Sequence, residues 1–194
     1  SLSPIQQRHV EETVLDFLHS GADLPAEQKK RIAEIDAELS KITKQYAENV
    51  LDATNAWELL ITDESRLAGL PSSSIAAARA NATAKGHGTD ESPAWRFTLQ
   101  QPSMFPVMQH ANDDALRQEI WQASVNVGSH APHDNSQNVW EILRLRQEKA
   151  EILGHKNFAD LVLQRRMARD GKTALAFTED LHERIARAFR QEYQ

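Results

Sequence analysis

The feature that most constrains the fold is a long stripe of apolar residues in the first third of the chain. After Pro25, apolar side chains recur at spacings of three and four residues, at Ile32, Ile35, Leu39, Ile42, Tyr46 and Val50. This period predicts an amphipathic helix. A helix over residues 25–53 would be about 43 Å long, at about 1.5 Å per residue. A stripe this narrow packs against a partner helix, and the helix that precedes it is the expected partner.

That preceding helix has recognisable ends. Ser3 is a capping residue, and Pro4 suits the first helical position because Pro has no N–H to leave unpaired there. Gly21 ends the helix. Its apolar residues are Ile5, Val10, Val14, Phe17 and Leu18. The two helices together predict a long helical hairpin.

Two short segments have the composition of strands. Residues 57–62 are rich in large apolar side chains, and residues 95–99 alternate between apolar and polar ones. We expect them to pair as a small sheet. Between them, Pro71 introduces an Ala-rich helix over residues 72–85, which Gly86 closes.

The second half of the chain returns to helical patterns. Four further helices are expected to begin at Asn112, at Asn135 or Ser136, at Asn157 and near Thr173. Only 7 Gly and 7 Pro interrupt the 194 residues, and no linker forces a domain boundary. The predicted fold class is mainly α, a multi-helix domain with a long helical hairpin and a small two-stranded β element. Residues 1–194 are expected to form a single helical region.

Composition excludes several classes of function. A formal net charge of −6 argues against non-specific nucleic-acid binding, and the basic residues Arg165, Arg166, Arg169 and Lys172 are expected on a solvated helix face. No stretch approaches the roughly 18–20 apolar residues of a membrane helix, and the amino terminus lacks a signal pattern. The chain contains no Cys, which excludes disulfides and thiolate chemistry and suits a reducing compartment.

The segment from His182 to Ala186 begins like the His-Glu-x-x-His motif of zinc peptidases. That motif needs a His at both i and i+4, because this spacing aims two imidazoles at one metal while the Glu activates water. Here Ala186 occupies the i+4 position. We expect His182 to be an exposed helix residue, paired with Glu179 one turn earlier.

A second histidine cluster, His130 and His133 followed by Asp134, falls in a predicted loop. It could bind a transition metal, but Pro132 lies between the imidazoles and the site is expected to be exposed. If this were a metal-binding protein, replacing both histidines would abolish metal uptake. We predict an ordinary loop, and no metal ligand in the chain.

No other catalytic pattern stands out. There is no Gly-x-Ser-x-Gly elbow, and the sequence around Gly86 and Gly88 is too short for a phosphate loop. Ser72 begins a helix. The four tryptophans, Trp57, Trp95, Trp121 and Trp140, are expected to anchor the core or the contacts between helices. We predict no catalytic residue, and the sequence does not indicate which residues bind substrate.

Several segments, specific only when taken together, resemble the thimet oligopeptidase family of zinc metallopeptidases, and its bacterial members most closely. They are residues 20–25, 49–63, 67–71, 102–111, 142–150 and 153–159. The resemblance lies with the helical amino-terminal part of these enzymes, upstream of their zinc motif. It implies that the chain is a fragment of the amino-terminal lobe of a larger two-lobed peptidase.

For the parent enzyme, the resemblance implies a cytoplasmic hydrolase that cleaves short peptides inside a channel, with zinc held in its other lobe. The fragment would then lack activity and zinc on its own, and its partners would be the missing carboxy-terminal catalytic lobe and, through it, peptide substrates. It would also tend to self-associate through the face that the other lobe covers. The alternative is a free-standing helical interaction module that uses the stripe from Ile32 to Val50 to engage a partner helix.

Overall fold

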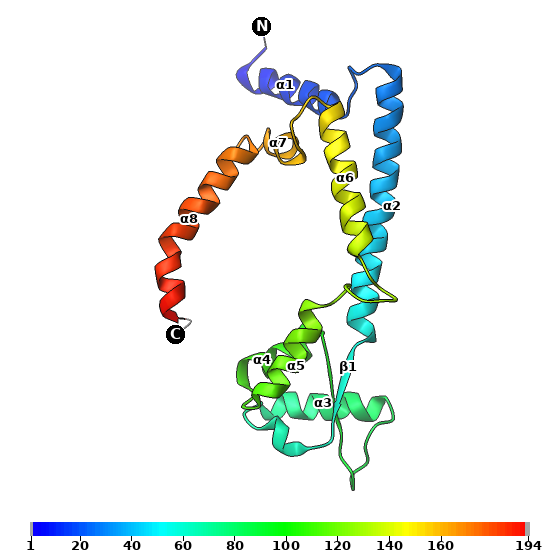
Figure 1. The fold of residues 1–194 in the computed structure, drawn as a ribbon, viewed down its shortest axis with the longest axis vertical. Coiled ribbons are helices and arrows are strands. Elements are labelled where there is room, and N and C mark those ends of the chain that lie inside the picture. Colours follow the sequence, from blue (N-terminus) through cyan, green and yellow to red (C-terminus); the bar gives the residue numbers. More distant parts are fainter. Residues whose placement is uncertain (1, 193–194) are drawn as a thin grey trace. The chain divides into compact units, whose positions relative to one another are not determined.

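The structure is a computed structural model and describes residues 2–192 (Figure 1). Within these residues, helices dominate and one pair of strands is present. The helices are α1 (Pro4–His19), α2 (Ala26–Ala56), α3 (Ser72–Ala84), α4 (Gln101–His110), α5 (Asp114–Val125), α6 (Ser136–Ile152), α7 (Phe158–Leu163) and α8 (Gly171–Glu192), with a 3₁₀ turn at Glu64–Leu67. The strands are β1 (Glu58–Ile61) and β2 (Trp95–Thr98). The predicted fold class is confirmed.

The chain divides into two compact units, which are described separately. Unit 1 comprises Ser1–Ile42 and Trp140–Gln194, and unit 2 comprises Thr43–Val139. Helix α2 passes from unit 1 into unit 2, and α6 begins in unit 2 and continues in unit 1.

In unit 1, α2 and α6 lie side by side and run in opposite directions (Figure 1). Ile32 and Ile35 of α2 are buried, as are Ile142 and Leu145 of α6. The predicted partner of α2 was therefore wrong, because α6 and not α1 covers the apolar stripe. Helix α1 contains no buried residue. Its polar side is bonded to the segment after α7, where Arg165 donates to Glu12 and Asp16.

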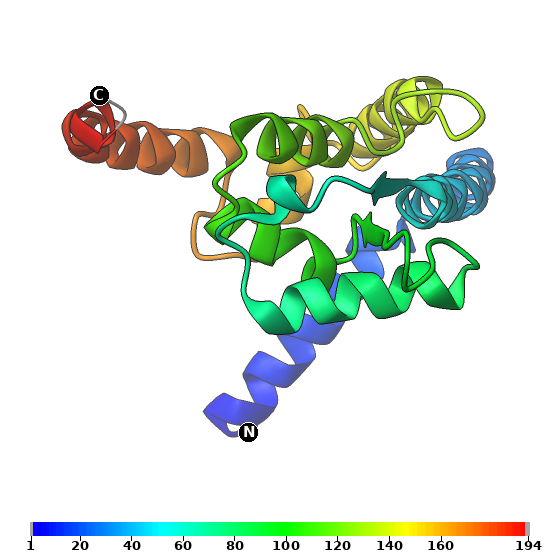
Figure 2. The same ribbon diagram turned by 90° about the horizontal axis from the view of Figure 1, so that it is seen from below.

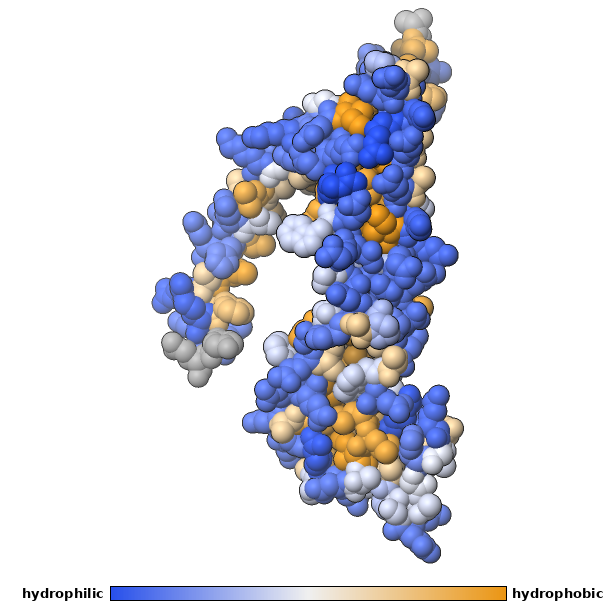
Figure 3. Space-filling model, turned by 45° about the vertical axis from the view of Figure 1, so that its right-hand side comes forward, coloured by the Kyte–Doolittle hydropathy of each residue, from blue (hydrophilic) through white to orange (hydrophobic). Residues whose placement is uncertain are grey.

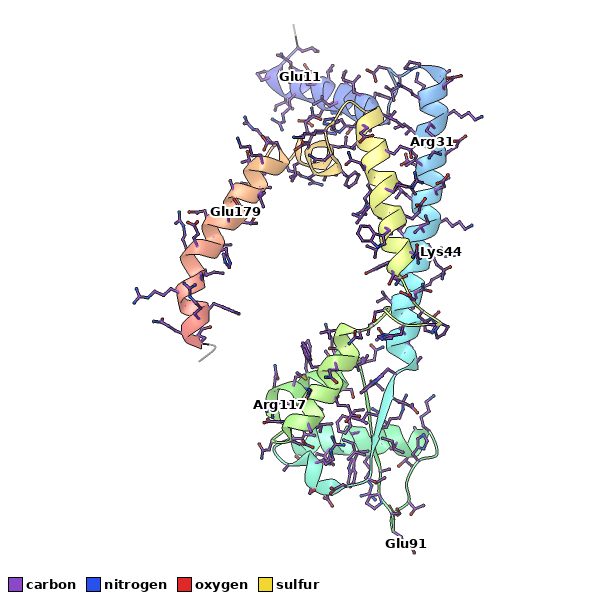
Figure 4. The ribbon with its side chains drawn as sticks, in the orientation of Figure 1. Glu11, Arg31, Lys44, Glu91, Arg117 and Glu179 are labelled. Carbon is purple, nitrogen blue, oxygen red and sulfur yellow. The ribbon has the colours of Figure 1, made fainter. Side chains whose placement is uncertain are left out.

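A two-pronged ion pair joins α2 and α6. The guanidinium of Arg31, labelled in Figure 4, donates from Nε to Oε1 of Glu148 at 2.6 Å and from Nη2 to Oε2 at 3.0 Å. The bond from Arg31 lowers the pKa of Glu148. Because a bidentate pair fixes orientation as well as charge, it sets the register of the two helices.

The Glu148→Gln variant should lose part of the acid sensitivity of the fold. The pKa of Glu148 is lower in the folded chain than in the unfolded one, so its contribution is present above the unfolded pKa of about 4.3 and is lost as the pH falls through the folded pKa. The variant should be less stable at pH 7, and the difference from wild type should shrink at pH 3. Urea unfolding at both pH values tests this. Glu48→Gln, in an exposed pair with Lys44, is the control and should change little.

Unit 2 is built around the antiparallel strands, as predicted. Leu59 lies opposite Phe97, and Ile61 lies opposite Trp95. Helices α3, α4 and α5 complete the unit, and Figure 2 shows α3 beside the strands. The core contains Phe97, which is 1% exposed, together with Ile61, Leu67, Leu70, Ala78, Trp95, Leu99, Val107, Ala111, Leu116 and Ile120. This core positions the polar groups described below.

A buried pair of amides attaches the loop before α6 to α2 within unit 2. Nδ2 of Asn49 donates to Oδ1 of Asn135 at 2.9 Å, and Nδ2 of Asn135 donates to the carbonyl oxygen of Tyr46 at 3.1 Å. The backbone N–H of Asn135 also donates to the carbonyl oxygen of Gly128. Asn135 is 4% exposed. Both the oxygen and the nitrogen of the Asn135 amide are therefore used in hydrogen bonds that hold this loop on α2.

Replacing this residue, Asn135→Ala, should destabilise unit 2 by about 1–3 kcal/mol, because the buried amide of Asn49 loses its acceptor and cannot reach water. Urea unfolding followed by circular dichroism measures the loss. Asn126→Ala is the matched control, since Asn126 is exposed and its side chain bonds, among residues 2–192, to the backbone of Gln122 and to Ser129. Equal losses in both variants would contradict the assigned role.

Several element boundaries differ from the sequence predictions. Helix α2 continues three residues past Ala53, and α8 begins two residues before Thr173. Asp113, not Asn112, caps α5, since its Oδ1 accepts from the N–H groups of Ala115 and Leu116. Helix α4 was not predicted, because it contains Pro102 and Pro106. Pro102 is in the first turn, where no N–H is needed, and Pro106 is tolerated inside a short helix.

Candidate functional site

The segment that resembles a zinc motif lies in α8. His182 is exposed on α8, and no hydrogen bond to Glu179 is present in the part of the chain that the structure describes. Among residues 2–192 there is also no group of three or more His, Asp or Glu side chains placed to hold a metal ion. The expected pairing of His182 with Glu179 is therefore absent.

The second histidine cluster lies in the loop between α5 and α6. Nδ1 of His130 is 2.8 Å from Oγ of Ser129, and Oδ1 of Asp134 accepts from the backbone N–H and the hydroxyl of Ser136. The two hydrogen bonds from Ser136 lower the pKa of Asp134. Asp134 therefore serves the turn that leads into α6, and it does not join the two histidines.

The basic residues after α7 were predicted to lie on a solvated helix face. Lys172 does lie exposed on α8, but the prediction was wrong for Arg165, Arg166 and Arg169, which fall in the segment between α7 and α8. Arg165 bonds to Glu12 and Asp16 of α1. These two acceptors raise the pKa of Arg165. Arg165 also lines an adjoining cavity of about 570 Å³, so one of the cations of that cavity is already neutralised.

Unit 2 contains a groove with a different character, lined by the end of α2, one face of α3, strand β2 and the start of α4. Its volume is about 380 Å³, within the roughly 300–1,000 Å³ typical of small-ligand sites. Most of the lining side chains are small or carry amides or hydroxyls. The lining residues are Thr54, Asn55, Ser74, Ala77, Ala78, Asn81, Arg96, Phe97, Thr98, Gln100, Pro102 and Ser103. We call this the β2 groove.

Some polar groups of the β2 groove hold one another in place. Nε2 of Gln100 donates to Oδ1 of Asn55 at 2.9 Å, and the N–H of Thr98 donates to Oγ of Ser103 at 3.0 Å. Nε of Arg96 donates to Oε2 of Glu58 at 2.6 Å and lowers the pKa of that carboxylate. The Arg96 charge is balanced by this pair. The β2 groove is therefore nearly neutral and rich in hydrogen-bonding groups.

The sequence did not point to this groove. Its residues match no motif, and amides and small side chains are ordinary on helix surfaces. The one available signal was the spacing of Ser74, Ala77, Ala78 and Asn81, which places them on one face of α3.

Exposed apolar side chains mark a second kind of surface, on α1 and α8 of unit 1. Helix α8 has no buried residue among those described, and apolar side chains follow its length in Figure 3. Phe177 is 67% exposed and Ile185 is 52% exposed. Trp121 and Trp140 are also exposed, at 53% and 70%, so the prediction that all four tryptophans anchor the core or the contacts between helices was wrong for these two.

Within residues 2–192, no helix is both long enough and apolar enough to cross a membrane.

The family model and the similar proteins found by comparison point to the same family. Residues 107–194 match the model of peptidase family M3. Oligopeptidase A of Salmonella typhimurium is 41% identical over 189 residues, which are 95% of this chain and 27% of that protein. A probable cytosolic oligopeptidase A of Arabidopsis thaliana is 39% identical over 170 residues, 87% of this chain and 24% of that protein.

A more distant relative is saccharolysin of Saccharomyces cerevisiae, 27% identical over 187 residues, 96% of this chain and 25% of that protein. The chain thus spans about a quarter of the length of these relatives, 24–27%. The bacterial and plant oligopeptidase A sequences are clearly more similar to it than saccharolysin is. The identity of about 40% over almost the whole chain, together with the match to the family model, shows that the chain belongs to the thimet oligopeptidase family, peptidase family M3.

Proposed function

We propose that this chain is a non-catalytic piece of a zinc-dependent oligopeptidase, and that it helps to position short peptides for hydrolysis carried out elsewhere in the parent protein. The observation that supports this most is the identity of about 40% to oligopeptidases over nearly all of a chain in which His182 has no second His one turn away. Positioning alone supplies a large part of many rate enhancements.

Under this proposal, the chain acts as one helical region in the amino-terminal lobe of a two-lobed enzyme and forms part of the wall of its peptide channel. The candidate ligands among residues 2–192 do not fit a zinc site, since His182 is isolated and Asp134 is engaged by Ser136. Zinc would be bound by the rest of the parent enzyme, where it would supply the activated water. No bond-making step is assigned to this chain.

The missing catalytic lobe is the proposed partner of the exposed apolar faces of α1 and α8. Apolar patches of this kind mark interaction surfaces. We place the parent enzyme in the cytoplasm, on the resemblance to bacterial oligopeptidases and on the absence of Cys. Self-association of the isolated chain through the same faces is the expected side effect.

The alternative, a free-standing interaction module, relied on the stripe of α2 to bind a partner helix. In unit 1, that stripe is used within the chain, because Ile32 and Ile35 are buried beside α6. No observation therefore favours the alternative.

The proposal is tested on the purified chain by measuring its zinc content and its cleavage of a quenched fluorescent oligopeptide. We expect no stoichiometric zinc and no turnover above buffer. Zinc bound at one equivalent together with peptide cleavage would overturn it.

A further inference from the structure

The loop between α5 and α6 lines another cavity of unit 2. This cavity has a volume of about 390 Å³, and its other lining residues come from the end of α2, from the end of α5, and from Trp57 and Leu99 beside the two strands. All of them belong to unit 2. We call it the loop pocket. Its volume falls within the roughly 300–1,000 Å³ that is typical of small-ligand sites.

One side of the loop pocket is the surface of the unit 2 core. Leu99 is itself a core residue, and Trp57, Ala123 and Val127 are partly buried side chains that pack against that core. All four line the pocket. Because the core holds them in place, this apolar side of the pocket is formed before any ligand binds, which lowers the cost of binding.

The loop side of the pocket is also held in place. The N–H of Asn135 donates to the carbonyl oxygen of Gly128 at 2.8 Å, and the side chain of Asn135 is bonded to Asn49 of α2. Within the loop, the N–H of His133 donates to the carbonyl oxygen of His130 at 3.0 Å. The buried amide pair of Asn49 and Asn135 therefore fixes the segment that carries the two histidines.

The lining of the loop pocket suits an uncharged aromatic ring. None of the lining residues that the structure describes is Asp, Glu, Lys or Arg, so a charged ligand would find no counter-ion among them. Three flat rings, those of Trp57, His130 and His133, belong to the lining. Aromatic rings attract one another beyond the effect of the apolar area they bury, so a flat ring is favoured over an aliphatic group of similar size.

We propose that the loop pocket binds an aromatic side chain of a peptide. The proposal rests on the proposed function for the choice of a peptide as the source of the ring, and it deepens that function by naming the class of side chain that this piece of the enzyme selects. The pocket would position the peptide through one side chain and would take no part in bond making.

The probe is N-acetylphenylalaninamide, an uncharged aromatic amide. It is titrated into the ¹⁵N-labelled chain with EDTA present, so that no metal links the two imidazoles. The indole N–H signal of Trp57, assigned by its loss in Trp57→Phe, should shift with saturation. N-acetylalaninamide should bind at least about tenfold more weakly, because it buries no ring. N-acetylleucinamide, which is apolar but has no ring, should bind several-fold more weakly.

A pair of variants locates the site. Ala56 lines the pocket and is exposed at the end of α2, so Ala56→Leu should fold, occupy part of the pocket and raise Kd at least about tenfold. Ala76→Leu makes the same change at an exposed alanine of α3, outside the pocket, and should bind like wild type. Circular dichroism checks the folding of both. If Ala56→Leu did not fold, the three amides measured on the wild-type chain would still decide the question.

The proposal is overturned if the Trp57 signal does not shift at millimolar N-acetylphenylalaninamide, or if the three amides bind equally. It is also overturned if the two folded Leu variants bind equally, or if the exposed Trp121 of α5 responds as strongly as Trp57. Zinc uptake or peptide turnover by the chain would sink the proposed function without altering these binding readouts, so the two failures are distinguishable.

Discussion

Replacing Gly69 by Ala should unfold unit 2 or weaken it by about 4 kcal/mol or more, an exceptional loss for one methyl group. Gly69 adopts φ +90° in the turn before α3, a region that side chains rarely enter. A Cβ there would collide with the backbone oxygen of His110 and would lie 2.7 Å from Oδ1 of Asn112. The backbone cannot move aside, because the N–H of Asn112 bonds to the carbonyl oxygen of Ala68 at 2.8 Å.

Gly86→Ala is the matched control for this prediction. Gly86 has a similar φ of +79° at the end of α3, but nothing lies within 4 Å of its added Cβ. It should therefore cost only the conformational strain, about 1–2 kcal/mol. Urea unfolding of both variants separates the clash from the strain. If Gly69→Ala lowered the free energy of unfolding no more than Gly86→Ala does, the turn would have to rearrange to accommodate the added methyl group.

Leu145→Ala should destabilise unit 1 by about 2–5 kcal/mol, since Leu145 is 0% exposed in the contact of α6 with α2 and its removal leaves a cavity. Leu143→Ala makes the same chemical change two residues earlier in the same helix, where the side chain is 50% exposed. It should cost no more than about 0.5 kcal/mol. Thermal and urea unfolding of the two variants provide the comparison, and similar losses would contradict the packing of α6 on α2.

The sequence predicted most elements because their signals are local. Ser3 and Pro4 set the start of α1, and the alternation around Phe97 identified β2. At the end of α3, the N–H of His87 bonds to the carbonyl oxygen of Ala82 beyond the left-handed Gly86, as helix C-caps with Gly do. Such features depend on a few neighbouring residues.

The predictions that failed concern contacts between residues that are far apart in the sequence. The stripe of α2 shows which face is apolar, but it does not say which helix covers that face, and α1 carries a stripe just as good. The partner is decided by long-range contacts such as that of Arg31 with Glu148, 117 residues apart. The β2 groove was missed for the same reason, because Asn55, Asn81 and Arg96 come from three elements.

Complementation by the rest of the parent protein tests the central claim most directly. The chain and the remaining catalytic part would be purified separately, and hydrolysis of a quenched fluorescent oligopeptide would be measured for each alone and for an equimolar mixture. The account predicts no activity from the chain, little from the catalytic part, and strong activity on mixing, lost when Ile185→Asp disrupts the apolar face of α8. Full activity of the catalytic part alone, unchanged by the chain, would contradict a positioning role.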